Sequence, residues 1–227
     1  MTPVGVDGCK GGWLAVAGRP PRLSARFFPT FADLLEAHPD AMVVVDMPIG
    51  FAEGREGRIV DGLMRGRLGS RRSSVFAPPC RDALYAEDYA TANAINRKVT
   101  GKGLSKQAWM IAAKMREVDA AITADLQGRI REGHPEVAFT EAAGAPMTHH
   151  KTKLHGLFAR LAVLQGLGID PANLIDTLPP DIAAQPDDLI DACILAHVAA
   201  RCIDGTALRL PDDPARDARG LAMEIWA

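Results

Sequence analysis

A short apolar run that ends in an acid is the feature that most constrains the fold. Residues 41–45 read Ala-Met-Val-Val-Val, and Asp46 follows them directly, just ahead of Pro48 and Gly50. A strand that is apolar on every side belongs in the middle of a sheet, with helices covering both faces. The run therefore predicts an α/β protein in which Asp46 lies at the end of a central strand.

Three more strands are expected before this run, at residues 3–8, 13–17 and 23–28. The turns between them are rich in glycine and proline (Gly11-Gly12 and Pro20-Pro21), which is typical of an antiparallel meander. Thr30 is a good N-cap for a short helix with one apolar face. Three meander strands, a helix and a central strand follow the element order of the ribonuclease H-like fold.

The rest of the chain predicts further α/β units around one insertion. Residues 51–103 are rich in Gly, Arg and Ser with weak periodicity, and we expect an insertion of loops and short helices there. After it we expect a long helix from Ser105, a short strand at 134–139 and helices at 153–167 and 187–203. A length of 227 residues suits a single domain, 1–227.

Charge and cysteine content exclude several classes of protein. The formal net charge of −2 gives no overall attraction to nucleic acid or to an anionic membrane. Positive charge is nevertheless concentrated in the middle of the chain, with seven arginines against two acids between residues 54 and 81. The four cysteines form no CxxC pair, and we see neither a signal peptide nor an apolar run long enough to cross a bilayer. These features favour a cytoplasmic protein that does not bind membranes.

Two aspartates lie at predicted strand ends. Asp7 ends the first strand and is followed by glycine, as Asp46 ends the central strand. Strand ends next to tight turns are where α/β sheets present their chemistry. Because burying an unpaired carboxylate is costly, each of these residues needs a cation, hydrogen-bond donors or water as a partner.

A second pair of aspartates begins the last predicted helix. Asp188 and Asp191 are three residues apart and project from one helix face. Asp188 is equally well explained as a helix cap, whereas Asp191 lies too deep in the helix to cap it. Together with the strand-end acids they predict a site for one or two Mg²⁺ or Mn²⁺ ions, which could serve phosphodiester hydrolysis.

Several further polar residues are candidates for the same site. Glu136 is a possible fifth catalytic acid, with an exposed strand residue as the alternative, and His134 is either a turn residue or a proton carrier. For phosphate binding the candidates are Lys10, Arg71, Arg72, Ser73, Ser74 and Lys153, with Lys151 as a further possibility. Solvated loop or helix-surface positions are the alternative for each of them.

The motifs that carry these residues resemble a known family. They are VDGCKGGW (6–13), VDMPIG (45–50), RLGSRRSSVF (67–76), GLSKQAW (103–109), KMREVD (114–119), HPEV (134–137) and DDLIDA (187–192). In this order they resemble the domain-of-unknown-function family 429, whose members are predicted ribonuclease H-like nucleases. Met47, where isoleucine is more usual, and His149-His150 are small departures. The helix acids also look like those of the Holliday-junction resolvase branch, where two strand acids and two helix acids hold metal.

The resemblance implies a nuclease or phosphodiesterase site at Asp7, Asp46, Asp188 and Asp191, acting on nucleic acid or a nucleotide-like phosphate. Two other functions remain open on the residues alone. DGCKGG (7–12) loosely fits the first phosphate loop of the actin-like ATPases, although no second glycine-rich loop follows. A non-catalytic module that binds an anion through the Arg-Ser segment is the third hypothesis.

Overall fold

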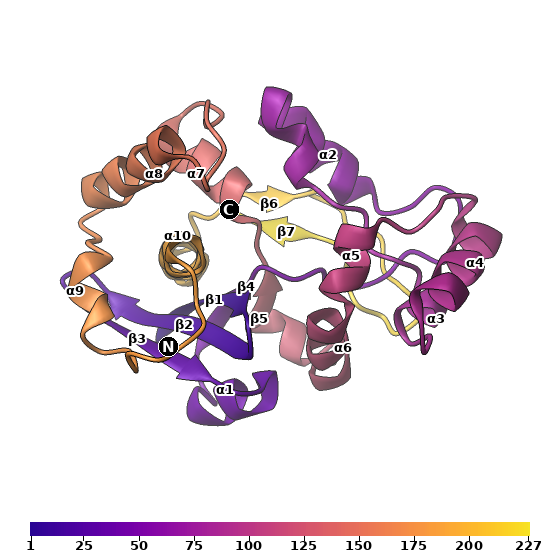
Figure 1. Ribbon diagram of the computed structural model, residues 1–227, viewed down its shortest axis with the longest axis horizontal. Helices are drawn as coiled ribbons and strands as arrows, with labels where there is room; N and C mark the ends of the chain where they lie inside the picture. The colour runs from indigo at the N-terminus through magenta and orange to yellow at the C-terminus, as the bar shows by residue number, and fades with distance from the viewer.

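A mixed five-stranded sheet lies at the centre of the computed structural model, which describes residues 1–227 (Figure 1). The strand order is β3-β2-β1-β4-β5. The first three strands pair antiparallel, and β4 and β5 continue the sheet in parallel with β1. The strands are β1 (Pro3–Cys9), β2 (Gly12–Arg19), β3 (Arg22–Phe28), β4 (Met42–Val45) and β5 (Ile130–Glu132).

Helices cover both faces of this sheet, as the apolar run of β4 requires. One face packs against α1 (Phe31–Ala37) and α6 (Ala112–Ala121). The other face carries α10 (Pro186–Asp204), which Figure 1 shows end-on between the strands and the outer helices. Those outer helices are α7 (Pro135–Ala143), α8 (Leu154–Gly166) and α9 (Ala172–Ile175).

Alternation along the strands decides which side chains meet α10. Val4 and Val6 of β1 point to the α1/α6 face, so Gly5 and Asp7 point to the α10 face. A Cβ atom built on Gly5 would lie 2.0 Å from the backbone nitrogen of Ala196, so only glycine fits there. The close approach of α10 to β1 thus depends on Gly5 and brings the helix directly against the strand that carries Asp7.

The residues between β4 and α6 form a separate group of helices to one side of the sheet (Figure 1). They are α2 (Ile59–Leu68), the 3₁₀ helix η1 (Gly69–Ser74), α3 (Arg81–Leu84), α4 (Tyr89–Thr100) and α5 (Lys106–Met110). Helix α2 packs on α7 and on the C-terminal β7 (Ile225–Trp226), which pairs with β6 (Arg209–Leu210). A short 3₁₀ turn, η2 (Leu126–Gly128), precedes β5.

Most predicted elements are confirmed, and the architecture is the expected mixed five-stranded sheet flanked by helices, consistent with a ribonuclease H-like layout. The first four strands, α1 with its Thr30 cap, α8 and α10 lie close to their predicted bounds. None of the helices is long and apolar enough to cross a membrane.

Two predictions were wrong. Residues 134–139 are not a strand: they begin α7, where Pro135 takes the first helical position after the extended His134. The fifth strand is instead the three-residue β5 just before them. The long helix expected from Ser105 is divided, since Ser105 caps only α5, and Ile111 separates α5 from α6.

Candidate active site

The register of the parallel strands places Asp7 beside Asp46. Val6 of β1 is opposite Val45 of β4, and the Asp46 amide donates to the Val6 carbonyl over 3.0 Å. Both aspartates therefore lie at the carboxyl ends of adjacent parallel strands, on the face of the sheet that meets α10. Asp7 is buried and accepts one hydrogen bond, from the amide of Gly8.

Helix α10, which packs on this face, carries the second pair of acids. Asp191 lies in its first turns and is 1% exposed, because α10 is buried on nearly every side. Asp188 takes part in a capping box, in which its carboxylate accepts from the Gln185 amide over 2.7 Å. The capping explanation for Asp188 is thus correct, although the residue also borders the same cavity as Asp7.

Lys151 supplies a positive charge among these acids. Its Nζ donates to Asp191 Oδ2 over 2.5 Å and lies 3.3 Å from Asp187 Oδ2. Burial would lower the pKa of Lys151, but Asp191, Asp7 and Asp46 outweigh this effect and hold the pKa above its ordinary value. The ammonium is therefore fully charged at neutral pH and balances part of the negative charge of the site.

Burial and mutual repulsion raise the pKa of the three innermost aspartates. Burial raises the pKa of Asp46 to about 6 and that of Asp191 to about 7, while Lys151 pulls both in the opposite direction. Burial, followed by the charges of Asp46 and Asp191, raises the pKa of Asp7 well above its usual value. Acids placed so that they repel one another in a cleft are typical of functional sites.

The carboxylate oxygens of the cleft are the type of ligand that a hard divalent cation prefers. Carboxylate oxygens are the ligands that Mg²⁺ and Mn²⁺ prefer, and Asp191 Oδ1 is buried without any hydrogen-bond partner. No three His, Cys, Asp or Glu side chains are grouped closely enough to hold a metal ion as they stand, and the Lys151 ammonium contacts Asp191. The acids therefore fit a cation by the chemistry of their oxygens, and binding one requires them to move closer together.

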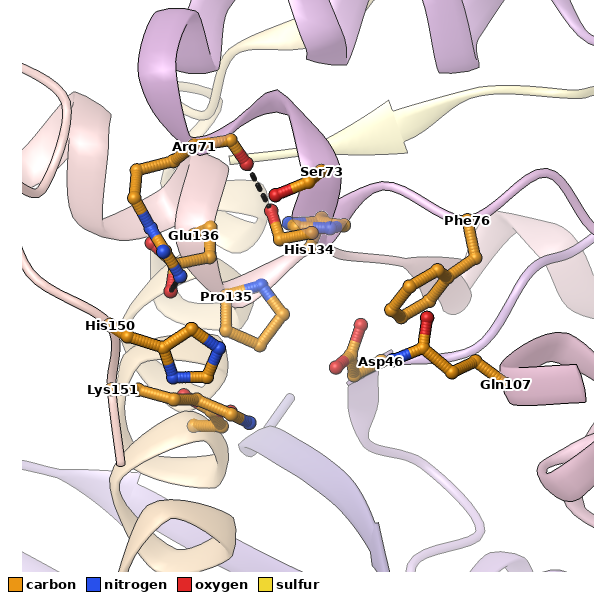
Figure 2. A pocket seen from close by; sticks show the side chains of 12 residues that line it. Asp46, Arg71, Ser73, Phe76, Gln107, His134, Pro135, Glu136, His150 and Lys151 are labelled. Atoms are coloured by element: carbon orange, nitrogen blue, oxygen red, sulfur yellow. Dashed lines mark hydrogen bonds and ion pairs between the residues drawn. The ribbon is translucent and has the colours of Figure 1, made fainter. Parts of the chain in front are cut away.

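A cleft opens over these acids, and Figure 2 shows Asp46 in it, between Arg71 and Phe76. It has two connected parts of about 430 and 220 Å³, which share Asp46, Ser74, Phe76, His134 and Lys151 in their walls. Asp191 borders the larger part and Asp7 the smaller. The four aspartates and the Arg- and Ser-rich segment therefore face one cleft.

Glu136 lies in the wall of the larger part, where two arginines contact it. Arg160, itself 1% exposed, donates to Glu136 Oε1 over 2.5 Å, and Arg71 Nη2 is 3.5 Å from the same oxygen. Glu136 Oε2 has no partner. Glu136 is thus a buried, paired helix residue at the first turn of α7, in place of the exposed strand residue considered above.

His134 borders both parts of the cleft. Its Nδ1 is buried and has no hydrogen-bond partner, and burial lowers the pKa of the ring. The imidazole is therefore neutral at pH 7 and can exchange a proton or a hydrogen bond with a ligand in the cleft.

Of the residues predicted to bind phosphate, Arg71, Ser73 and Ser74 line the cleft. Lys10, Arg72 and Lys153 are exposed and line neither part of it. Phe76, Gln107 and His150 border the larger part, but sequence reasoning did not single them out. Phe76 and Gln107 lie in the motifs RLGSRRSSVF and GLSKQAW, and His150 in the His149-His150 departure, but no role was assigned to any of them.

Comparison with known families gives one match. The family model described as "Protein of unknown function (DUF429)" matches residues 5–216, which include every aspartate of the cleft. No curated protein and no solved structure gives a significant match.

Proposed function

The chain belongs to the DUF429 family, and we propose that it is a metal-dependent phosphodiesterase, with one or two Mg²⁺ or Mn²⁺ ions held by Asp7, Asp46, Asp188 and Asp191. The proposal includes nucleases, since nucleic acid is the commonest phosphodiester.

One observation carries the proposal. Asp7, Asp46 and Asp191 come from two strands and a helix, are held together against their own repulsion, and leave a buried oxygen, Asp191 Oδ1, without a partner. A protein gains no stability from such an arrangement unless a cation compensates it. Lys151 compensates only part of the charge, because Asp7 and Asp46 have no ion-pair partner within 4 Å.

The residues around the acids fit a reaction at phosphorus. When bound, Mg²⁺ or Mn²⁺ would lower the pKa of a water nucleophile and stabilise the leaving oxygen. Arg71 and Ser73 offer donors to the non-bridging phosphate oxygens, whereas the Ser74 hydroxyl already donates to the Arg71 carbonyl over 2.9 Å. His134, neutral at pH 7, lies between the two groups and can accept the proton of the attacking water.

Lys151 also supports a second candidate, a non-catalytic module that binds an anion. Its ammonium already contacts Asp191 and Asp187, so the acids can be accommodated without metal. Arg71 and Ser73 would then bind phosphate for recognition alone. Divalent-cation binding separates the two candidates.

The test is a calorimetric titration of Mn²⁺ into the full chain at pH 8, followed by a Mn²⁺-dependent assay with bis(p-nitrophenyl) phosphate and single-stranded DNA and RNA. Asp191→Asn and Asp7→Asn are expected to weaken Mn²⁺ binding at least about tenfold and to abolish hydrolysis, because each removes a charged ligand. Asp40→Asn, an exposed acid outside the cleft, is the matched control and should change neither.

Failure to bind Mn²⁺ at millimolar concentration would leave the anion-binding module as the better account. Tight binding without hydrolysis of any phosphodiester would contradict the catalytic part of the proposal.

A further inference from the structure

The larger part of the cleft has the composition of a pocket for an anion next to a flat ring. Its walls are almost entirely polar, with Phe76 as the one large apolar side chain. Figure 2 shows Phe76 and Gln107 on one side of the cavity, Arg71 and His150 on the other, and Asp46 between them. The volume of about 430 Å³ lies within the range of sites for small organic ligands, roughly 300–1,000 Å³.

The positive charge of Arg71 is available to a ligand. Glu136, its only acidic partner, is already bound 1.0 Å more closely by Arg160, which is fully buried behind it. Arg71 Nε is buried and has no hydrogen-bond partner. A guanidinium with a weak ion pair and an unused donor, next to the hydroxyl of Ser73, is suited to bidentate binding of phosphate. The hydroxyl of Ser74 donates to the Arg71 carbonyl over 2.9 Å and holds the turn that carries the guanidinium.

The ring of Phe76 is the apolar aromatic surface that the cleft offers to a ligand. Its side chain is 38% exposed inside an otherwise polar cavity, and no aromatic or cationic group of the chain stacks on it. Nucleobases stack on such rings irrespective of sequence. The amide of Gln107, on the same side, can form hydrogen bonds with a base edge.

We propose that this pocket binds one nucleotide, with its phosphate at Arg71 and Ser73 and its base on Phe76. The inference rests on the proposed function for the reaction and names its substrate class. The ligand is either a free nucleotide or the terminal nucleotide of a single strand. An enclosed site for one nucleotide agrees with a net charge of −2, which does not favour long contacts with a polyanion.

Calorimetry in EDTA measures nucleotide binding in the absence of divalent metal, and therefore without metal-dependent hydrolysis. Adenosine 5′-monophosphate, ribose 5-phosphate and the 5′-phosphorylated dinucleotide pApA are titrated into the full chain. Adenosine monophosphate is expected to bind at least about fivefold more tightly than ribose 5-phosphate, since stacking of one base contributes that much or more. Tighter binding of pApA would identify a strand end, and tighter binding of the monophosphate a free nucleotide; both outcomes support the pocket.

Two variants separate the phosphate and base contacts. Arg71→Gln should weaken the binding of adenosine monophosphate and of ribose 5-phosphate at least about tenfold. Phe76→Leu should weaken the binding of adenosine monophosphate about fivefold and leave the binding of ribose 5-phosphate unchanged. Their matched controls are Arg72→Gln and Phe158→Leu, which change an exposed arginine and an exposed phenylalanine outside the pocket.

Equal affinity of the wild type for adenosine monophosphate and ribose 5-phosphate would overturn the inference without the need for any variant. Unchanged nucleotide binding in both Arg71→Gln and Phe76→Leu would also overturn it. If Mn²⁺ binds but no nucleotide does, the inference fails and the proposed function stands; nucleotide binding without any Mn²⁺ binding overturns the proposed function alone.

Discussion

At the scale of single residues, Lys151 has the largest influence on how the acids behave. Its ammonium contacts Asp191 and Asp187 and is held charged by the surrounding carboxylates. In the absence of metal it is therefore the main compensation for a buried negative cluster. A cation that enters the cleft must compete with it for Asp191.

Replacement of Lys151 by methionine is expected to raise Mn²⁺ affinity about tenfold while lowering stability without metal. The substitution removes the competing ammonium, but it leaves Asp191 buried and unpaired, which costs roughly 1–3 kcal/mol. Calorimetry measures the affinity, and urea unfolding in EDTA measures the stability. Lys153→Met, at an exposed neighbouring position, is the control. Unchanged or weaker Mn²⁺ binding by Lys151→Met would show that the ammonium does not compete for the site.

The sequence predicted which acids border one cleft, but not which basic residues compensate their negative charge. Asp7, Asp46 and Asp191 stood out because a carboxylate at a strand end or deep in an apolar helix has no simple structural explanation. Arg160 and Lys151 gave no such signal, because a basic residue near a helix surface is ordinary until its neighbours are known. Their burial depends on α7 and the loop after it, which the sequence did not resolve.

At the scale of elements, the contact between β1 and α10 positions the site. The charges of Asp7 and Asp191 interact because the helix backbone approaches the strand at Gly5, where a Cβ would lie 2.2 Å from the Ala192 carbonyl oxygen. Neither backbone can give way without moving the whole helix.

Gly5→Ala is accordingly expected to destabilise the protein by at least about 3 kcal/mol, at the upper end of the cost of overpacking. It should also weaken Mn²⁺ binding, since α10 carries two of the acids. Urea unfolding provides the measurement. Gly62→Ala, on the exposed face of α2 with nothing within 4 Å, is the control and should stabilise by roughly 0.5–1 kcal/mol. Equal stability of Gly5→Ala and wild type would contradict the close approach.

Elements were predicted well where pattern and length agreed. The apolar run of β4, the capped α1 and the long buried α10 each carried a distinct signal. HPEVAF was assigned to a strand because a short apolar run fits a strand or a buried helix equally well. The division between α5 and α6 gave no signal, because Trp109, Ile111 and Met115 pack against the same core and their spacing fits one continuous helix.

At the scale of the whole molecule, the acids make stability depend on pH and on metal. In the folded chain the pKa values of Asp46 and Asp191 are about 6 and about 7, and that of Asp7 is also raised, against about 3.9 when unfolded. Folded-state pKa values above the unfolded ones mean that the stability from these groups is present below about pH 4 and is lost as the pH rises through 6 to 7. Half-buried His134 and His197, whose pKa values are lowered by partial burial, contribute in the opposite direction.

A comparison of wild type with Asp7→Asn isolates the contribution of the acids from that of the histidines. In EDTA the melting temperatures of the two proteins should differ least at pH 5, because the raised pKa of Asp7 favours its neutral form at low pH. At pH 8 Asp7→Asn should melt about 3 °C or more above wild type, because roughly 1 kcal/mol shifts Tm by 2–4 °C at this size. Added Mn²⁺ should raise the Tm of wild type much more than that of the variant. A difference in Tm that does not change with pH would contradict the raised pKa of Asp7.

An anomalous difference map of crystals soaked in Mn²⁺ at pH 8 shows whether the four aspartates bind a divalent cation. We expect manganese within bonding distance of Asp7, Asp46, Asp188 and Asp191, with the Lys151 ammonium withdrawn from Asp191. A map without this manganese peak, in which Lys151 still donates to Asp191, would contradict the proposed cation site.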